Sequence, residues 1–388
     1  MQNFAIYIHY PFCKSKCPYC DFNSHVTNKN IDYNRFLKAY EQELEFFANN
    51  IENKVVTSIF FGGGTPSLMP ISLVAEILNK ISQLWKIADG CEITLEANPT
   101  SAERQKFQDL KKIGINRLSL GIQALNNDDL RFLGREHSSQ EAIKTIEFTK
   151  KIFDNFSFDL IYARSKQTLK QWEEELNKAL KFQSPHLSLY QLTIEKGTRF
   201  YSDFQQKKFD LPNENLSAEL YELTNELTSK NGLNIYEISN YAKNNFQSKH
   251  NLSYWQGDDY IGIGAGAHSR IYFKNSKLRS AIVMHHEPNK WLESLEIKGS
   301  AIKNHDYISK KELSYELLLM GLRVKKGLNK KILSYNLGVD FDKIFDVKKL
   351  QKLQDQGLIC FENDYININP QQFLLCNTII AKTIECLY

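Results

Sequence analysis

The most informative segment of this 388-residue chain is Tyr7-Ile8-His9-Tyr10-Pro11-Phe12-Cys13-Lys14-Ser15-Lys16-Cys17-Pro18-Tyr19-Cys20-Asp21-Phe22. Three of the seven cysteines lie here in the spacing C-x3-C-x2-C, and the other four are isolated. Soft thiolates at this density are ligands for an iron–sulfur cluster or for zinc. Structural zinc needs four protein ligands, whereas three cysteines leave one iron of a 4Fe–4S cluster open to a small molecule. A zinc site completed by His9 or His25, or three unliganded thiols, are the alternatives.

Strand and helix patterns alternate outward from this segment through the first half of the chain. Apolar runs rich in β-branched and aromatic residues predict strands at 4–9, 55–61, 91–97, 117–123, 158–162 and 186–192. The intervening segments, such as 72–85 and about 102–112, have helical apolar spacing. Six strands separated by helices, without tight hairpin turns, predict a parallel sheet that forms an open sheet or a barrel. Functional residues of such sheets gather at the carboxyl ends of the strands.

Polar residues occupy those strand ends. The sequence Gly62-Gly63-Gly64-Thr65-Pro66 follows the second strand, where glycines let backbone N–H groups approach a ligand closely. A plain tight turn is the alternative. Glu96 and Gln123 end the third and fourth strands, and a carboxylate in an apolar strand is costly without a partner. Arg135 and Asp159 lie in similar settings, and each of these four could instead serve a structural role, such as a salt bridge for Glu96.

The last part of the chain has a different pattern. From about residue 309 the sequence predicts a helix, short helices near 329–337 and 347–356, a two-stranded ribbon around 359–368 and a closing helix at 371–387. Helices with a small ribbon are typical of a winged helix. We therefore expect a β/α unit at 1–235, an aromatic and glycine-rich connecting region at 236–305, and a winged-helix-like domain at 306–388.

Composition limits the classes of function. The net charge is +4, which argues against a nucleic-acid-binding protein, although residues 303–352 carry twelve Lys and Arg against six Asp and Glu. That basic region is either a docking face or an ordinary solvated surface. There is no apolar run of transmembrane length. Residues 1–7 lack the basic start of a signal peptide, and the odd cysteine count indicates a reducing compartment, so we expect a cytoplasmic protein.

The cysteine motif followed by the Gly-Gly-Gly-Thr-Pro turn resembles the radical S-adenosylmethionine superfamily. Further motifs narrow the resemblance, over nearly the whole chain, to the group of oxygen-independent coproporphyrinogen III oxidases: Leu95-Glu96-Ala97-Asn98-Pro99, Gly121-Ile122-Gln123, Gly134-Arg135-Glu136-His137 and Asp159-Leu160-Ile161-Tyr162. The resemblance implies a partial (β/α)6 barrel followed by a winged-helix-like domain.

The resemblance also implies ligands for two cofactors. Cys13, Cys17 and Cys20 would bind a 4Fe–4S cluster. The S-adenosylmethionine pocket would be lined by Tyr7, Tyr19, Gly63, Gly64, Thr65, Glu96, Gln123, Arg135 and Asp159. One turn departs from the family, which has Gly-Leu-Pro after the Asp-Leu-Ile-Tyr motif, where this chain has Ala163-Arg164-Ser165-Lys166.

Two further departures point to a subfamily. Oxidases of this group carry a fourth cysteine where this chain has Phe22, and they carry an amino-terminal extension, whereas here the motif starts at Tyr7. Both features resemble the haem chaperone subfamily HemW. Its H-N-x-x-Y-W motif, associated with haem, corresponds to His250-Asn251-Leu252-Ser253-Tyr254-Trp255. A neutral imidazole is a normal haem ligand, so His250 is the first candidate and His268 the second, with a structural role as the alternative for each.

Three hypotheses follow. The leading one is a haem-trafficking protein that binds the cluster, S-adenosylmethionine and haem, and delivers haem to acceptors of the respiratory chain, with homodimers and docking at the inner membrane surface as expected associations. The second is radical decarboxylation of coproporphyrinogen III propionates. The radical machinery is present, but the missing fourth cysteine argues against that enzyme. The third, nucleic-acid binding by the winged-helix-like domain, is disfavoured by the net charge.

Overall fold

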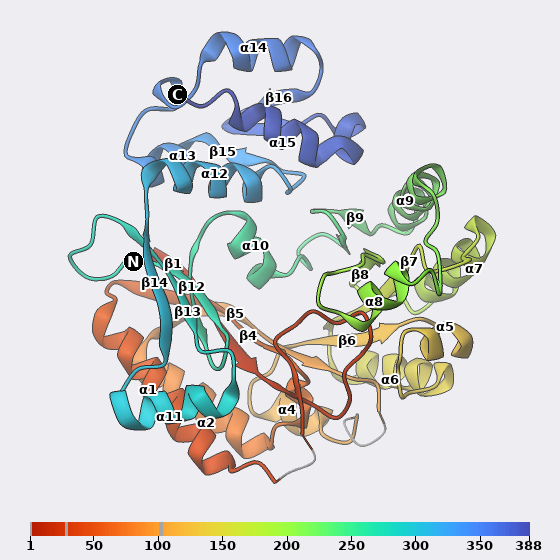
Figure 1. Cartoon of the computed structure of the whole chain (residues 1–388), viewed down its shortest axis with the longest axis vertical. Coiled ribbons are helices and arrows are strands. Elements are labelled where there is room, and N and C mark those ends of the chain that lie inside the picture. The colour runs from red at the N-terminus through yellow and green to blue at the C-terminus, as the bar shows by residue number, and fades with distance from the viewer. Residues whose placement is uncertain (1, 28–29, 101–103) are drawn as a thin grey trace.

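The computed structural model describes residues 2–27, 30–100 and 104–388. Its main sheet contains strands β1 (Gln2–Tyr10), β4 (Lys54–Gly63), β5 (Lys86–Ala97), β6 (Arg117–Gln123), β7 (Asn155–Tyr162), β8 (His186–Gln191), β9 (Asn234–Ile235), β10 (Asn240–Ala242), β11 (Asp259–Ile263), β12 (His268–Ile271), β13 (Arg279–Met284) and β14 (Ile302–Ile308) (Figure 1). The order across the sheet is β14-β13-β12-β11-β1-β4-β5-β6-β7-β8-β10-β9. The run from β11 to β8 is parallel, and both edges are antiparallel. The six predicted strands are all present, and the α/β class is as predicted.

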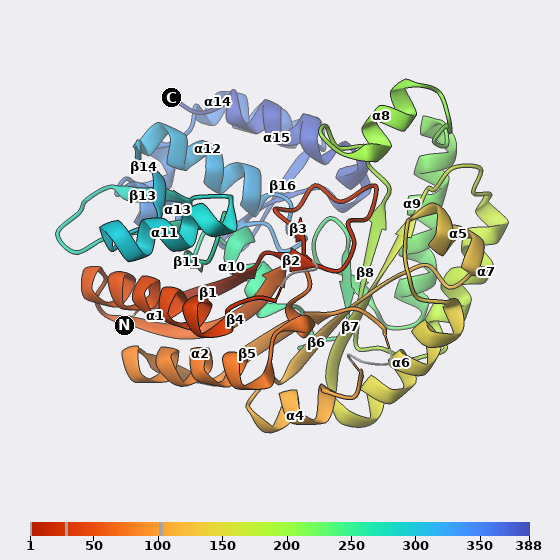
Figure 2. The same cartoon turned by 60° about the horizontal axis from the view of Figure 1, so that its bottom comes forward.

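Helices cover the outer face of this curved sheet (Figure 2). They are α1 (Tyr33–Asn50), α2 (Ile71–Leu84), α4 (Phe107–Lys112), α5 (Asn127–Phe132), α6 (Ser139–Ile152), α7 (Leu169–Leu180), α9 (Glu214–Lys230) and α11 (Pro288–Lys298), with α8 (Arg199–Gln205) above the β8 end. Residues 102 and 103 of the helix expected at 102–112 lie outside the described residues, and α4 begins at Phe107. Ser138 caps α6 in a reciprocal capping box with Glu141, which explains where that helix begins.

The central strands are buried on both faces, which explains their nearly continuous apolar sequences. In β1, Phe4, Ile6 and Ile8 are fully buried, as are Val56 and Phe61 in β4. Helices pack on one side of these strands, and the other side meets residues of the cysteine loop and the carboxyl-terminal half. The core therefore holds the carboxyl ends of the strands in fixed positions beneath the loops that follow them.

The segment 236–305, expected as a connecting region, supplies β10 to β13 and the start of β14 to the main sheet. Strand β11 pairs in parallel with β1, with Phe4 opposite Asp259. A buried ion cluster joins this segment to β4. The Asp259 carboxylate of β11 accepts from Lys54 of β4 at 2.5 Å and contacts Arg279 of β13 at 3.2 Å. Helix α10 (Lys249–Trp255) precedes β11 and contacts β4.

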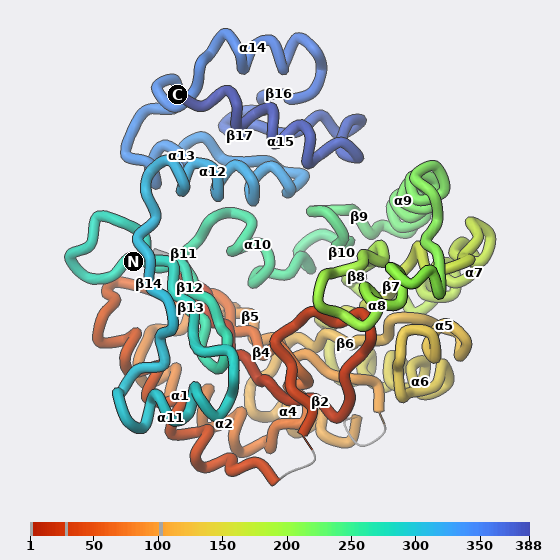
Figure 3. Tube along the Cα trace, viewed as in Figure 1, coloured from red at the N-terminus to blue at the C-terminus, as the bar shows by residue number. Residues whose placement is uncertain are grey.

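The carboxyl-terminal unit has a second hydrophobic core. It contains α12 (Lys310–Gly321), β15 (Leu328–Asn329), α13 (Lys330–Leu337), α14 (Val347–Asp355), β16 (Ile359–Glu362), β17 (Tyr365–Ile368) and α15 (Cys376–Ile384). The sheet order is β15-β17-β16, so the predicted two-stranded ribbon corresponds to β16 and β17, and β15 adds a third strand that the sequence did not predict. An ion pair from Arg270 to Glu316 at 3.1 Å ties α12 to the main sheet, and α10 lies between the two units (Figure 3). Among the described residues, the helices are too short or too polar to span a membrane.

Candidate functional site

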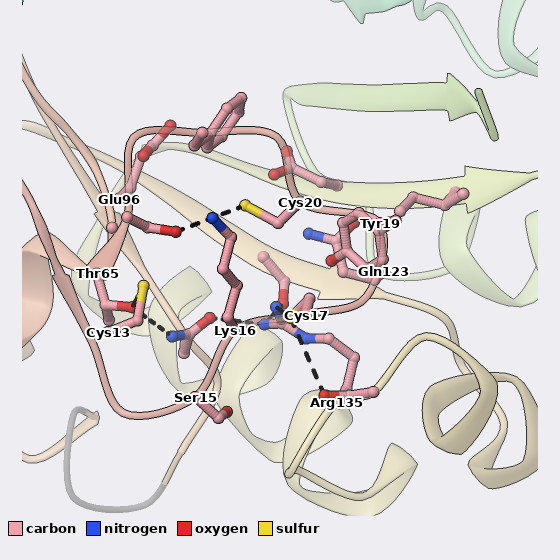
Figure 4. A pocket seen from close by; sticks show the side chains of 18 of the residues that line it. Cys13, Ser15, Lys16, Cys17, Tyr19, Cys20, Thr65, Glu96, Gln123 and Arg135 are labelled. Carbon is pink, nitrogen blue, oxygen red and sulfur yellow. Dashed lines mark hydrogen bonds between the residues drawn. The ribbon is translucent and has the colours of Figure 1, made fainter. Parts of the chain in front are cut away.

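The three clustered cysteines lie around one cavity at the carboxyl ends of the central strands. Cys13, Cys17 and Cys20 line this first cavity, which has a volume of about 450 Å³. Figure 4 shows them in the same cavity as Thr65, Glu96, Gln123 and Arg135. The carboxyl ends of β4, β5 and β6 and the cysteine loop after β1 therefore meet at one cavity, where the sequence predicts that functional residues gather.

Contacts to distant elements hold the cysteine loop. The His9 Nε2 atom is 2.9 Å from the Asn23 carbonyl, and the Asn23 amide donates to the carbonyls of Ala265 and His286. On the other side the Pro18 carbonyl accepts from Phe200 N–H at 2.9 Å. The loop is thereby fixed at Pro18, within the cysteine motif, and at Asn23, after it, so the fold as well as the spacing determines where its sulfurs lie.

Each sulfur has a polar neighbour. Thr65 Oγ1 donates to Cys13 Sγ at 3.5 Å, and Arg135 Nη1 donates to Cys17 Sγ at 3.3 Å. Burial raises the pKa of the Cys13 and Cys20 thiols. Thiols of raised pKa ionise when a metal binds them. Three partly buried sulfurs with hydrogen-bond donors beside them are a donor set that fits an iron–sulfur cluster.

The glycine turn after β4 passes directly under the cysteine loop. Gly64 N–H donates to the Tyr10 carbonyl at 2.7 Å, and Thr65 N–H donates to the Phe12 carbonyl at 2.9 Å. A Cβ atom on Gly64 would lie 2.5 Å from the Phe12 carbonyl oxygen, which leaves no room for a side chain. Gly63 has a φ of +112°, a conformation that favours glycine. The turn therefore positions the cysteine loop, and the N–H groups of Gly64 and Thr65 are used in bonds to that loop.

Charged groups of the first cavity have buried atoms without a hydrogen-bond partner among the described residues. Among the described residues, Glu96 accepts only a long hydrogen bond, from Gly63 N–H at 3.3 Å, and burial, with the nearby Asp159, raises its pKa to about 8. Burial raises the pKa of Asp159 to about 6, and its Oδ1 atom is buried without a partner among the described residues. The Arg135 Nε atom is likewise unpartnered. Two carboxyl groups and a guanidinium at one cavity are complementary to a ligand that carries both cationic and anionic groups.

Gln123 ends β6 in the left-handed region, with a φ of 71°. A residue with a side chain occupies that region at a cost of about 1–2 kcal/mol, and such strain clusters at functional sites. Eight of the nine residues predicted for the S-adenosylmethionine pocket line the first cavity, namely Tyr19, Gly63, Gly64, Thr65, Glu96, Gln123, Arg135 and Asp159. Tyr7 lines a neighbouring cavity instead, where its hydroxyl is 3.0 Å from His9 Nδ1.

Two further residues belong to this site and were not predicted. The Asn98 side-chain oxygen accepts from Arg135 Nη2 at 2.6 Å, and its nitrogen donates to Thr65 Oγ1 at 3.2 Å. Tyr190, at the end of β8, lines both cavities and is 40% exposed. Both follow the same strand-end rule that located Glu96, so the signal was present in the sequence.

The second cavity lies between the main sheet and the carboxyl-terminal unit and has a volume of about 1390 Å³. Aromatic side chains from α10 and β11, including Tyr254, Trp255 and Tyr260, line it together with α12. It shares Phe22, Glu96 and Tyr190 with the first cavity, so the two adjoin. Phe22 is 57% exposed and lines both cavities.

His250 lies in the wall of the second cavity with both ring nitrogens in hydrogen bonds. Its Nδ1 atom is 3.0 Å from Ser58 Oγ, and its Nε2 atom is 2.8 Å from the Tyr254 hydroxyl. The ring stacks on Phe60 at 4.9 Å and is 1% exposed. Burial lowers its pKa to about 3, so the imidazole is neutral. His268, the second candidate, is exposed in the same cavity.

The turn that departs from the family motif does not reach either cavity. Arg164 is 1% exposed and pairs with Glu175 at 2.5 Å and Asp129 at 2.7 Å. Ala163 has a φ of 54°, in the region that glycine favours. The basic side chain of this turn is therefore part of a buried ion network and does not line the first cavity.

Known proteins resemble this chain along its whole length. The sequence profile of the Radical SAM superfamily matches residues 7–179, and that of the HemN C-terminal domain matches residues 308–375. Heme chaperone HemW of Bacillus subtilis (strain 168) is 33% identical over 380 residues, which cover 97% of this chain and 98% of the relative. Radical S-adenosyl methionine domain-containing protein 1, mitochondrial, of Danio rerio is 33% identical over 369 residues, covering 92% and 83%. The solved structure of coproporphyrinogen III oxidase (HemN) from Escherichia coli shares the fold, with a TM-score of 0.81 at 20% identity over 98% of this chain and 90% of that one.

Proposed function

Because the chain belongs to the radical S-adenosylmethionine superfamily, in the group that includes the HemW proteins, we propose that it is a haem-trafficking protein. It binds a 4Fe–4S cluster through Cys13, Cys17 and Cys20, and S-adenosylmethionine in the first cavity. It binds haem in the second cavity and delivers it to acceptor proteins. A cluster bound by three cysteines supplies an iron with an open position and a source of electrons.

The proposal rests on two adjoining cavities that differ in size and in the side chains that line them. The first is lined by the three thiols and by charged groups, some of whose buried atoms have no hydrogen-bond partner among the described residues, which suits a small zwitterion. The second is larger and lined by aromatic rings, which suits a flat apolar macrocycle. Phe22 lies in both walls at the position where the resembling oxidases carry a fourth cysteine. That replacement favours a chaperone over coproporphyrinogen III oxidase, which is the alternative function.

Haem titration tests the proposal directly. The full chain, reconstituted anaerobically with iron and sulfide, should bind one hemin per chain, and Soret absorbance follows the binding. It should then pass the haem to an apo-haem protein in solution. The same preparation, given a reductant and S-adenosylmethionine, should leave coproporphyrinogen III unchanged. Conversion to protoporphyrinogen IX would instead establish the oxidase, and failure to bind hemin would remove the chaperone function.

Binding of S-adenosylmethionine should depend on pH through Glu96. Its pKa of about 8 means that the carboxyl is mostly neutral at pH 7, whereas a cationic ligand group prefers the carboxylate. Binding at lower pH must therefore release a proton, and the affinity should rise by up to about tenfold per pH unit as pH increases from 6 to 8. Isothermal titration of the reconstituted protein at several pH values measures this.

The matched variants are Glu96→Gln and Glu195→Gln. The glutamine at 96 cannot ionise, so that variant should bind weakly at pH 8 and show a flatter pH profile. Glu195 is an exposed carboxyl that lines the same cavity, and its variant should keep the wild-type profile. A wild-type affinity that is constant over this pH range would show that Glu96 does not face the ligand's cationic group.

A further inference from the structure

The second cavity is lined by four histidines, and two of them have no nitrogen available for a ligand. They are His9, His250, His268 and His286. His9 has Nδ1 at 3.0 Å from the Tyr7 hydroxyl and Nε2 at 2.9 Å from the Asn23 carbonyl. His250 is held in the same way between Ser58 and Tyr254. Ligation of an iron by either ring would require a buried hydrogen bond to break and a packed side chain to move.

His268 differs in exposure and in its hydrogen bonds. It is the first residue of β12, in which His268 and Arg270 face away from the core while Ser269 and Ile271 are fully buried. The side chain is exposed, and it makes no hydrogen bond with any residue that the structure describes. Burial, the Arg270 guanidinium and His286 lower its pKa, so the ring is neutral at pH 7, as metal ligation requires.

The backbone of His268 is also fixed. Strand β12 pairs with β13, where His268 lies opposite Val283, and with β11 through Tyr260 and Arg270. Arg270, on the same face, is anchored by Glu316 of α12. His286 is exposed as well, but it lies in the bend between β13 and α11. A side chain on a paired strand is held more precisely than one on a bend.

We infer that His268, and not His250, is the axial ligand of haem iron in the second cavity. The inference rests on the haem-binding function proposed above and specifies its site. His250 is then a positioning residue, because its Nε2 atom fixes the hydroxyl of Tyr254, whose ring packs edge-on against Tyr260 at 4.5 Å. These two rings form part of the apolar wall that a porphyrin would contact.

Four single variants of the full chain test the assignment: His268→Ala, His250→Ala, His286→Ala and the control His305→Ala. The His305 ring, bonded to Ser280 on the adjoining strands, is not among the residues that line the cavity. Each is titrated with hemin, and the Soret maximum and the electron paramagnetic resonance spectrum report the axial ligand. We expect His268→Ala alone to lose the signature of histidine-ligated haem, and added imidazole to restore it.

The outcomes separate the inference from the function on which it rests. If the wild type does not bind hemin, both fail. Suppose that the wild type binds hemin, that His268→Ala keeps the signature of histidine-ligated haem, and that His250→Ala or His286→Ala loses it. The assignment of His268 is then wrong, and the haem-binding function stands. The assignment is also wrong, and the haem-binding function stands, if every variant keeps the signature of histidine-ligated haem. Because His250 is buried, His250→Gln is measured beside His250→Ala, with thermal unfolding and iron content as controls for folding.

Discussion

Replacing Cys20 with alanine is expected to remove the iron–sulfur cluster completely. The three sulfurs around the first cavity come from one loop, and the structure places no fourth cysteine there, because Phe22 occupies the position two residues after Cys20. Two thiolates cannot hold three corners of a 4Fe–4S cluster. Iron and acid-labile sulfide of the reconstituted variant should therefore fall to background, together with the visible absorbance. Binding of S-adenosylmethionine should weaken with it.

The matched control is Cys360→Ala. Cys360 is partly exposed, as Cys20 is, but it lies in the ribbon of the carboxyl-terminal unit. That variant should retain the iron and sulfide content of the wild type. Metal analysis also decides between the two sites that the C-x3-C-x2-C spacing allows, an iron–sulfur cluster and a zinc site. Zinc in stoichiometric amount in the wild type, without iron or acid-labile sulfide, would contradict the cluster and support a site completed by His9 or His25.

The site could be predicted from sequence to the extent that local patterns determine it. β6 spans Arg117–Gln123, the same residues as the predicted fourth strand, and Gln123 lies at its carboxyl end in the first cavity. Glu96 is placed by the same rule. Parallel strands carry this information because their apolar runs are continuous and their ends coincide at one edge of the sheet.

The parts of the fold and of the site that local patterns do not predict depend on contacts between residues that are far apart in the sequence. β11 is five residues long and forms a strand because β1, more than 250 positions away, offers it an edge. The residue pattern within 236–305 gives no signal of the pairing between β11 and β1. For this reason the sequence predicted only a connecting region there. The histidine of the H-N-x-x-Y-W motif is a similar case. The motif identifies His250 and Tyr254 as important, but the partner that occupies Nδ1, Ser58, lies on another strand.

The second large effect is expected in Arg164→Met, which should lower the free energy of unfolding by about 3–5 kcal/mol. Arg164 is almost fully buried, and its guanidinium contacts Glu175, Asp129 and the Ile161 carbonyl. Methionine keeps much of the side-chain volume but leaves the buried Glu175 carboxylate without its cation. Removing one member of a buried pair costs more than the pair itself contributes, because the remaining charge has lost its solvent as well. Urea unfolding followed by circular dichroism measures the change.

Two controls identify the buried charge as the cause. Arg131→Met removes an exposed pair with Asp128, and it should change the free energy of unfolding by less than about 1 kcal/mol. The double variant Arg164→Met/Glu175→Gln should recover part of the loss, because glutamine is neutral and its carbonyl still accepts from Leu125 N–H. No recovery would assign the loss to packing instead. Affinity for S-adenosylmethionine should stay at the wild-type value in all three, since the turn that replaces the family's Gly-Leu-Pro contributes to the support of the barrel and not to the pocket.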